Sequence, residues 1–271
     1  MNNNEMAENA TVPWVILHVP HASLLIPDDV RDRLLLSDQE LDLELNRLTD
    51  HFTDELFRVS HPAVATVQFP ISRFVVDPER FHSDEQEPMA ERGQGVIYTQ
   101  TTNGNPLRNP PDQAERAALL DKWYWPHHRE LEKRTLDALA AHGRALVIDC
   151  HSFPSLPLPV DLDQTPNRPD FCIGTDPFHT PGELAEAFKS KLQRDDYTAE
   201  LDRPYAGTLV PAFAWRKDPC VMSIMVEVNR RLYLKDEPRD VSCGKDFERT
   251  RRVIAGLVLS ATQSATSLVV V

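Results

Sequence analysis

Short apolar runs alternate along this chain with segments of helical periodicity, and this alternation restricts the fold more than any other feature. The runs predict buried strands because they are brief, contain β-branched residues and stop at Pro, Gly or polar residues. The six predicted strands are residues 14–19, 63–67, 73–76, 145–148, 171–173 and 221–228. Strands that alternate with helices favour an α/β fold, here a single domain with a mixed, mostly parallel sheet and helices on both faces.

Helical segments lie between these strands. Ser37 and Glu40 form a capping box, and Leu and Phe then recur at spacings of three and four up to Phe57. A second helix ends at Gly143, a residue typical of a left-handed C-cap. The predicted helices are residues 37–57, 112–142, 181–194 and 246–259.

The remaining segments are predicted to be loops and chain ends. Residues 78–111 are rich in Gly, Pro, Asn and charge, and such long loops are often functional. Residues 153–170 form a second, proline-rich loop. We expect residues 1–12 to be a disordered tail and residues 13–271 to be one domain. The apolar end, residues 253–271, is interrupted by Ser and Thr, which predicts a last core helix followed by a strand or frayed end rather than a membrane span.

Composition excludes several classes of partner and site. The chain has 29 basic and 42 acidic residues, a net charge of −13, so we expect no binding to nucleic acid or anionic membranes. Its 4 cysteines form no CxxC pair, which argues against a zinc ribbon or a disulfide framework. The polar start lacks the features of a signal peptide, so we expect a cytoplasmic protein.

Two histidines follow predicted strands and are candidate metal ligands. His21 and His151 come directly after strands, where open α/β sheets bind their ligands. A strand-end histidine can instead simply cap the backbone. A catalytic zinc usually has three protein ligands, so a carboxylate partner is needed. Asp50 and Asp54, four apart on one predicted helix face, are the candidates, and His51 is a competing ligand. Two such acids are otherwise typical of a solvated surface.

A buried acid and two arginines are further candidates. Glu227 lies within an apolar strand, where desolvation is expected to raise its pKa towards that of a general base. The alternative is a Glu that faces solvent or pairs with Arg230. Arg73 and Arg80 bracket another predicted strand, with Asp77 between them. They are either surface charges or a clamp that binds an anion in a two-point fork.

Taken together, these motifs resemble the N-formylglutamate amidohydrolase family. The matching segments are Val19-Pro-His-Ala-Ser23, Thr49-Asp-His-Phe-Thr-Asp54, Ser72-Arg-Phe-Val-Val-Asp77 with Arg80, Gly95-Val-Ile-Tyr98, Asp149-Cys-His-Ser152 and Glu227-Val-Asn-Arg230 with Tyr233. They span most of the chain in the expected order. One departure is Asp77-Pro-Glu-Arg80, where the family more often shows Asp-Leu-Asn-Arg; Arg80 is matched, but the residue before it is not.

The resemblance implies a zinc-dependent hydrolase with a fold similar to the zinc carboxypeptidases and aspartoacylase. Its substrate would be an N-acylated acidic amino acid such as N-formyl-L-glutamate, as in histidine degradation. His21 and His151 would bind one zinc ion, and Glu227 would be the catalytic carboxylate. The carboxypeptidases take their carboxylate ligand three residues after the first histidine, where this chain has Leu24. The third ligand must therefore come from elsewhere, and Asp50 is preferred.

We expect the zinc to activate a water molecule and Glu227 to move its proton to the leaving amine. Arg80 would stabilise the oxyanion with zinc, and Arg73 would hold the carboxylate of the substrate. Arg203, Tyr205 and Gly207 are expected to line the same cleft.

Three alternatives remain open at the level of sequence. A cysteine hydrolase would pair Cys150 with His151, but neighbouring residues on a strand point to opposite faces. A metal-dependent phosphoesterase would use similar ligands around two metal ions. A non-catalytic protein on the same fold could bind small anions without metal. These motifs contain no information on oligomeric state.

Overall fold

The structure, a computed structural model, describes residues 12–236 and 240–263. Its main sheet has six strands in the order β2-β1-β3-β6-β4-β5, and neighbouring strands are parallel except β4 with β6. These strands are β1 (Val15–Val19), β2 (Val64–Gln68), β3 (Ala145–Phe153), β4 (Phe171–Gly174), β5 (Ala199–Leu201) and β6 (Val221–Asn229). A separate hairpin pairs β7 (Leu234–Asp236) with β8 (Asp240–Cys243). The predicted α/β fold with a mostly parallel sheet is confirmed.

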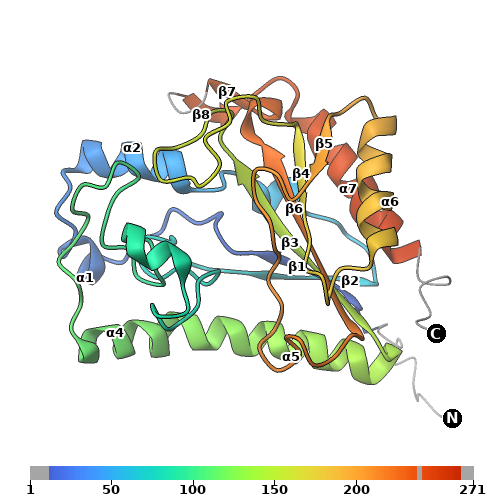
Figure 1. Ribbon diagram of the computed structural model, residues 1–271, viewed down its shortest axis with the longest axis horizontal. Helices are drawn as coiled ribbons and strands as arrows, with labels where there is room; N and C mark the ends of the chain where they lie inside the picture. Colours follow the sequence, from blue (N-terminus) through green and yellow to red (C-terminus); the bar gives the residue numbers. More distant parts are fainter. Residues whose placement is uncertain (1–11, 237–239, 264–271) are drawn as a thin grey trace, which may run out of the picture.

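Helices cover both faces of this sheet. Every residue of β1, β3 and β6 is buried, and because successive strand residues point to opposite faces, both faces must be covered. Figure 1 shows α5 on one side of the sheet, and α6 and α7 on the other. The helices are α1 (Asp28–Arg31), α2 (Asp38–Leu48), α3 (Thr53–Leu56), α4 (Gln113–Leu119), α5 (Trp125–His142), α6 (Gly182–Arg194) and α7 (Phe247–Gln263).

The single helix predicted over residues 37–57 is wrong, because the chain breaks between α2 and α3. The capping box at the start of α2 is present, as predicted. Thr49 is extended, and Phe52 has a φ of 62°, in the left-handed region. The backbone N–H of Asp50 donates to the carbonyl of His21 at 3.0 Å. Because a tertiary hydrogen bond holds the break, the helical periodicity of the sequence gives no sign of it.

The strand predicted at residues 73–76 is also wrong. This segment turns, with the Val75 N–H bonded to the Ser72 carbonyl at 2.9 Å, and it pairs with no strand. Phe74, Val75 and Val76 are fully buried by packing alone. The apolar run at residues 73–76 therefore predicted burial correctly but did not form a strand.

Other predicted elements are confirmed with changed boundaries. The helix predicted at 112–142 is α4 and α5 joined through a π-helical turn at Leu120–Tyr124, and it ends at Gly143 with a φ of 67°. Strand β3 continues to Phe153, so His151 lies inside it rather than after it. Strands β5, β7 and β8 were not predicted.

The predicted disordered tail falls outside the described residues, except for Val12, and so does the strand or frayed end predicted after α7. Among the helices of the described ranges, none has the length and hydropathy needed to span a membrane.

Candidate metal centre

Three side chains from separate parts of the chain converge at one edge of the sheet. His21 follows β1, Asp50 lies in the break between α2 and α3, and His151 lies in β3. Oδ2 of Asp50 is 3.5 Å from Nδ1 of His21 and 3.1 Å from Nδ1 of His151. Tetrahedral zinc bonds of about 2.0–2.1 Å place donor atoms about 3.3 Å apart. The spacing of these three atoms therefore suits one zinc ion.

The chemical state of these donors also suits a cation. All three residues are buried, and Nδ1 of His21 has no hydrogen-bond partner. Burial by itself would raise the pKa of Asp50, but His151 and His21 hold it well below its usual range. The group therefore offers an ionised carboxylate and an unpartnered ring nitrogen, as a divalent metal site requires.

The orientation of His21 is fixed by a buried network behind it. Nε2 of His21 donates to Oδ1 of Asp77 at 2.8 Å. The other oxygen of Asp77 accepts from Arg73 Nη2 at 2.8 Å and from the Tyr98 hydroxyl at 2.5 Å. A carboxylate that accepts from the far nitrogen of a histidine fixes its tautomer and leaves the near nitrogen free to bind metal.

Asp50 has a comparable hydrogen-bonded support, and His151 has a carboxylate close to its far nitrogen. Oδ1 of Asp50 accepts from Arg230 Nη2 at 3.1 Å and from the Ser152 hydroxyl at 3.2 Å, which leaves Oδ2 directed at the histidines. Nε2 of His151 lies 3.1 Å from Oδ1 of Asp149 but forms no hydrogen bond with it, while Nδ1 of His151 faces Asp50. The sequence motifs contained Arg230, Ser152 and Asp149, but nothing local to them indicated these contacts.

Glu227 lies beside the candidate ligands. It is on β6, directly opposite His151 of β3 in the sheet register, and it is only 7% exposed. This excludes a side chain that faces solvent. Its Oε2 has no hydrogen-bond partner. Burial raises the pKa of Glu227 to about 8, with Asp50 adding to the shift and His151 opposing it.

The two predicted clamp arginines have different surroundings. Arg73 is committed to protein groups, since it donates to Asp77, to the Tyr98 hydroxyl at 3.0 Å and to the Leu48 carbonyl at 3.2 Å. Arg80 lies 3.8 Å from Asp77 through Nε, which has no hydrogen-bond partner. Arg80 is therefore better placed than Arg73 to bind a substrate anion.

The predicted cleft residues lie on the segment that follows β5. Arg203 pairs with Glu200 at 2.6 Å, and its side chain is 33% exposed. Gly207 has a φ of 93°, a conformation that favours glycine. Two residues later the Leu209 N–H donates to Oδ2 of Asp149 at 3.0 Å, which ties this segment to the metal centre.

The broken helix favours Asp50 over Asp54 as the candidate carboxylate ligand. Asp54 lies in α3, and the group of donor atoms contains Asp50 but neither Asp54 nor His51. Asp50 lies outside both helices, so the two aspartates do not share a helix face as their spacing had suggested.

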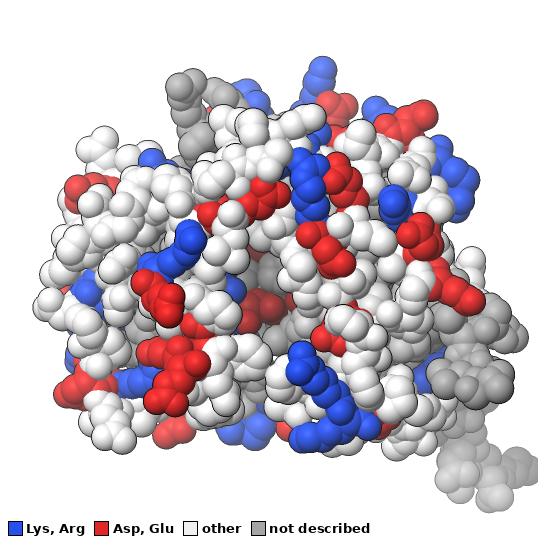
Figure 2. Space-filling model, in the orientation of Figure 1, with Lys and Arg blue, Asp and Glu red and all other residues white. Residues whose placement is uncertain are grey.

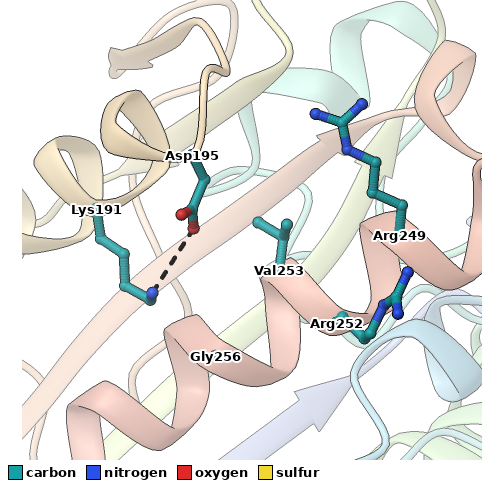
Figure 3. A pocket seen from close by; sticks show the side chains of 6 residues that line it. All are labelled: Lys191, Asp195, Arg249, Arg252, Val253 and Gly256. Carbon is teal, nitrogen blue, oxygen red and sulfur yellow. Dashed lines mark ion pairs between the residues drawn. The ribbon is translucent and has the colours of Figure 1, made fainter.

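Figure 2 shows a hollow near the centre of one face of the molecule, with acidic side chains visible at its depth. A separate cavity of about 350 Å³ lies between α6 and α7, where Lys191 and Asp195 form an ion pair at 3.6 Å (Figure 3). Arg249, Arg252, Val253 and Gly256 complete its lining. This lining includes no histidine, so we assign the cavity no catalytic role.

Comparison with known proteins bears on both the family and the fold. The profile of the N-formylglutamate amidohydrolase family matches residues 13–234. The structure is similar to N-formylglutamate amidohydrolase from Ralstonia eutropha JMP134, with a TM-score of 0.79 and 18% identity over 94% of this chain and 96% of that one. It is also similar to a gene product of Agrobacterium tumefaciens, with a TM-score of 0.59 and 20% identity over 94% and 93%. No curated protein sequence matches the chain. At these identities the solved structures bear on the fold alone, which they confirm.

Proposed function

The chain belongs to the N-formylglutamate amidohydrolase family and is a hydrolase of amide C–N bonds, and we propose that it uses zinc to remove a formyl or other acyl group from the nitrogen of an acidic amino acid. One observation carries this proposal: Nδ1 of His21, Oδ2 of Asp50 and Nδ1 of His151 converge beside the buried Glu227. Three protein ligands next to a carboxyl group are typical of metal-dependent hydrolases.

His21, Asp50 and His151 would hold the ion. Bound zinc supplies a Lewis acid that polarises an acyl oxygen and lets water ionise near neutral pH. Asp77, Arg230 and the groups around them keep the three donors in place before the ion binds. Such support is typically worth a factor of about 10–100 in metal affinity.

Glu227 is the proposed general base and acid. Burial raises the pKa of Glu227 to about 8 in the metal-free protein, and a divalent ion beside it would lower that pKa and favour the carboxylate form. The carboxylate can therefore take the proton of the attacking water and return it to the leaving amine. The partner-free Oε2 is available for this transfer because no protein group occupies it.

Arg80 is the proposed contact for the negative charge of the substrate. Its guanidinium lies near the metal centre at Asp77, and a guanidinium binds carboxylates and oxyanions in a two-point fork. The role first expected for Arg73, that of holding the substrate carboxylate, passes to Arg80 in this proposal. Arg73 acts instead through Asp77, as a positioning residue for His21.

The test is hydrolysis of N-formyl and N-acetyl derivatives of Glu, Asp and a neutral amino acid, with metal content measured in parallel. We expect the formylated acidic substrates to be cleaved, a chelator to stop cleavage and zinc to restore it. Glu227→Gln should retain zinc and lose a factor of about 10²–10⁴ in kcat.

Two control measurements separate this proposal from its alternatives. Phosphate release from p-nitrophenyl phosphate, with no cleavage of the amides, would instead support a phosphoesterase. Tight binding of the acidic amino acid with little bound zinc would support a non-catalytic protein. Full activity of Glu227→Gln would contradict the role of that residue.

A further inference from the structure

A second group of metal-binding residue types lies on the far side of His151 from Asp50. His18 is in β1, Asp149 is in β3, and Glu79 is in the loop after residue 77. Nδ1 of His18 lies 2.9 Å from Oδ1 of Asp149 and 3.0 Å from Oε1 of Glu79. None of these three residues belongs to the proposed zinc ligands.

The group has more buried negative charge than a single proton on His18 can satisfy. The His18 side chain and the Asp149 side chain are fully buried, and that of Glu79 is 13% exposed. Nδ1 of His18 makes a hydrogen bond to Asp149, but Oε1 of Glu79 has no hydrogen-bond partner despite the short distance. Two buried carboxylates share at most one positive charge, that of His18, so this position favours a further cation.

His151 supplies a second, independent observation. Its side chain is 7% exposed, and its Nε2 has no hydrogen-bond partner, although it lies 3.1 Å from Asp149 and 3.9 Å from Glu79. Nε2 of His151 is therefore close to the carboxylate oxygens but lacks hydrogen-bond geometry with them. Donor atoms that surround one metal ion have this arrangement. The unpartnered nitrogen is directed at the group from the side opposite to Asp50.

His127 gives His18 the support that a ligating histidine needs. The Nε2 atoms of the two rings lie 2.8 Å apart, so one donates and the other accepts. When His127 accepts from Nε2–H of His18, the Nδ1 lone pair of His18 faces the two carboxylates, ready to bind metal.

We propose that His18, Glu79 and Asp149 form a second site for a divalent transition-metal ion such as Zn²⁺ or Mn²⁺. One imidazole and two carboxylates suit these ions, and carboxylate-rich sites favour Mn²⁺ more than histidine-rich sites do. The site depends on Glu79, which with Pro78 is one of two residues at which Asp77-Pro-Glu-Arg80 departs from the Asp-Leu-Asn-Arg pattern of the resemblance. This second metal site is therefore proposed for this chain, and metal binding at it does not require the substrate.

The experiment is an ion count. The metal-free protein is dialysed against excess Zn²⁺ or Mn²⁺ and then against buffer, and bound metal is measured by plasma mass spectrometry. We expect two ions per chain in the wild type and one in Glu79→Asn, a variant that carries the residue more common in the family. Glu85→Asn, an exposed change in the same loop, is the matched control and should keep two.

Anomalous diffraction from crystals at the metal edge then assigns each ion to its ligands. His21→Asn should lose the ion at Asp50 and keep the one at His18. His18→Gln, a second variant at the new site, should do the reverse. One ion per wild-type chain at saturating metal, or two ions in both Glu79→Asn and His18→Gln, would overturn the second site. Loss of the second site would leave the proposed hydrolase intact, because substrate cleavage is measured separately.

Discussion

Replacing Glu227 by Gln should stabilise the metal-free protein at neutral pH while it removes activity. Burial raises the pKa of this carboxyl from 4.5 to about 8 in the folded protein. Below pH 4.5 the group is protonated in both the folded and the unfolded chain, so it has no effect on stability. Between pH 4.5 and 8 the unfolded chain releases the proton that the folded chain keeps. The free energy of unfolding therefore falls with rising pH, by about 1.4 kcal/mol per pH unit.

At pH 7 the penalty amounts to about 3 kcal/mol, a large part of the ~5–15 kcal/mol by which a domain is stable. Gln has nearly the shape of Glu but does not titrate, so the variant lacks this penalty. We expect the two proteins to be about equally stable at pH 4.5 and the variant to be more stable at pH 7, with the gap constant above pH 8.

Urea unfolding of chelator-treated protein at pH 5, 6, 7 and 8 measures this gap. The control is Glu248→Gln, the same chemical change at an exposed residue of α7, which should alter stability by less than about 0.5 kcal/mol at every pH. A gap between wild type and Glu227→Gln that stays the same from pH 5 to pH 8 would refute the argument that burial controls this carboxyl group.

Three further predictions concern the supports of the centre. Arg230→Met removes the cation beside Oδ1 of Asp50, so zinc affinity should fall by a factor of about 10–100 in competition with a chromophoric chelator; a change below twofold would contradict its role. Tyr98→Phe removes one hydrogen bond to Asp77 and should lower the free energy of unfolding by about 1 kcal/mol in urea titrations. Arg80→Lys keeps the charge but loses the two-point fork, so kcat/KM for an acidic substrate should fall about tenfold more than for a neutral one; equal losses would show that Arg80 does not contact the anion.

Much of the sheet and part of the site were predictable because their signals are local. A buried strand needs only a few consecutive apolar residues, and both His21 and His151 stand at or near the ends of such runs. The burial of Glu227 was predictable for the same reason, since it lies inside an apolar strand. These features are properties of short segments, and the fold preserves them.

The contacts between segments were not predictable in the same way. Asp50 was identified as a ligand from its neighbours on an assumed helix face, but it is positioned by a break in the helix and a backbone hydrogen bond to His21. Arg73 was expected to face the substrate, but it is bound to Asp77 through contacts made only in the folded chain. In both cases the residue type was informative, while the geometry depended on tertiary contacts.

The division of charge at the centre would allow an acidic chain to bind the anionic substrate that we propose. Arg230 neutralises the charge of Asp50, and Arg73 neutralises that of Asp77 at 2.8 Å. Neither arginine is therefore available to pair with a substrate anion. Arg80 lies 3.8 Å from the same Asp77, which is already paired, and therefore keeps most of its positive charge for another partner. Asp149 and Glu79 add two negative charges beside His151, and a bound divalent ion would offset them, so the charge of Arg80 would remain for a substrate anion within a protein of net charge −13. Under the proposed function, an anionic substrate would thus be attracted to the metal centre by this local charge.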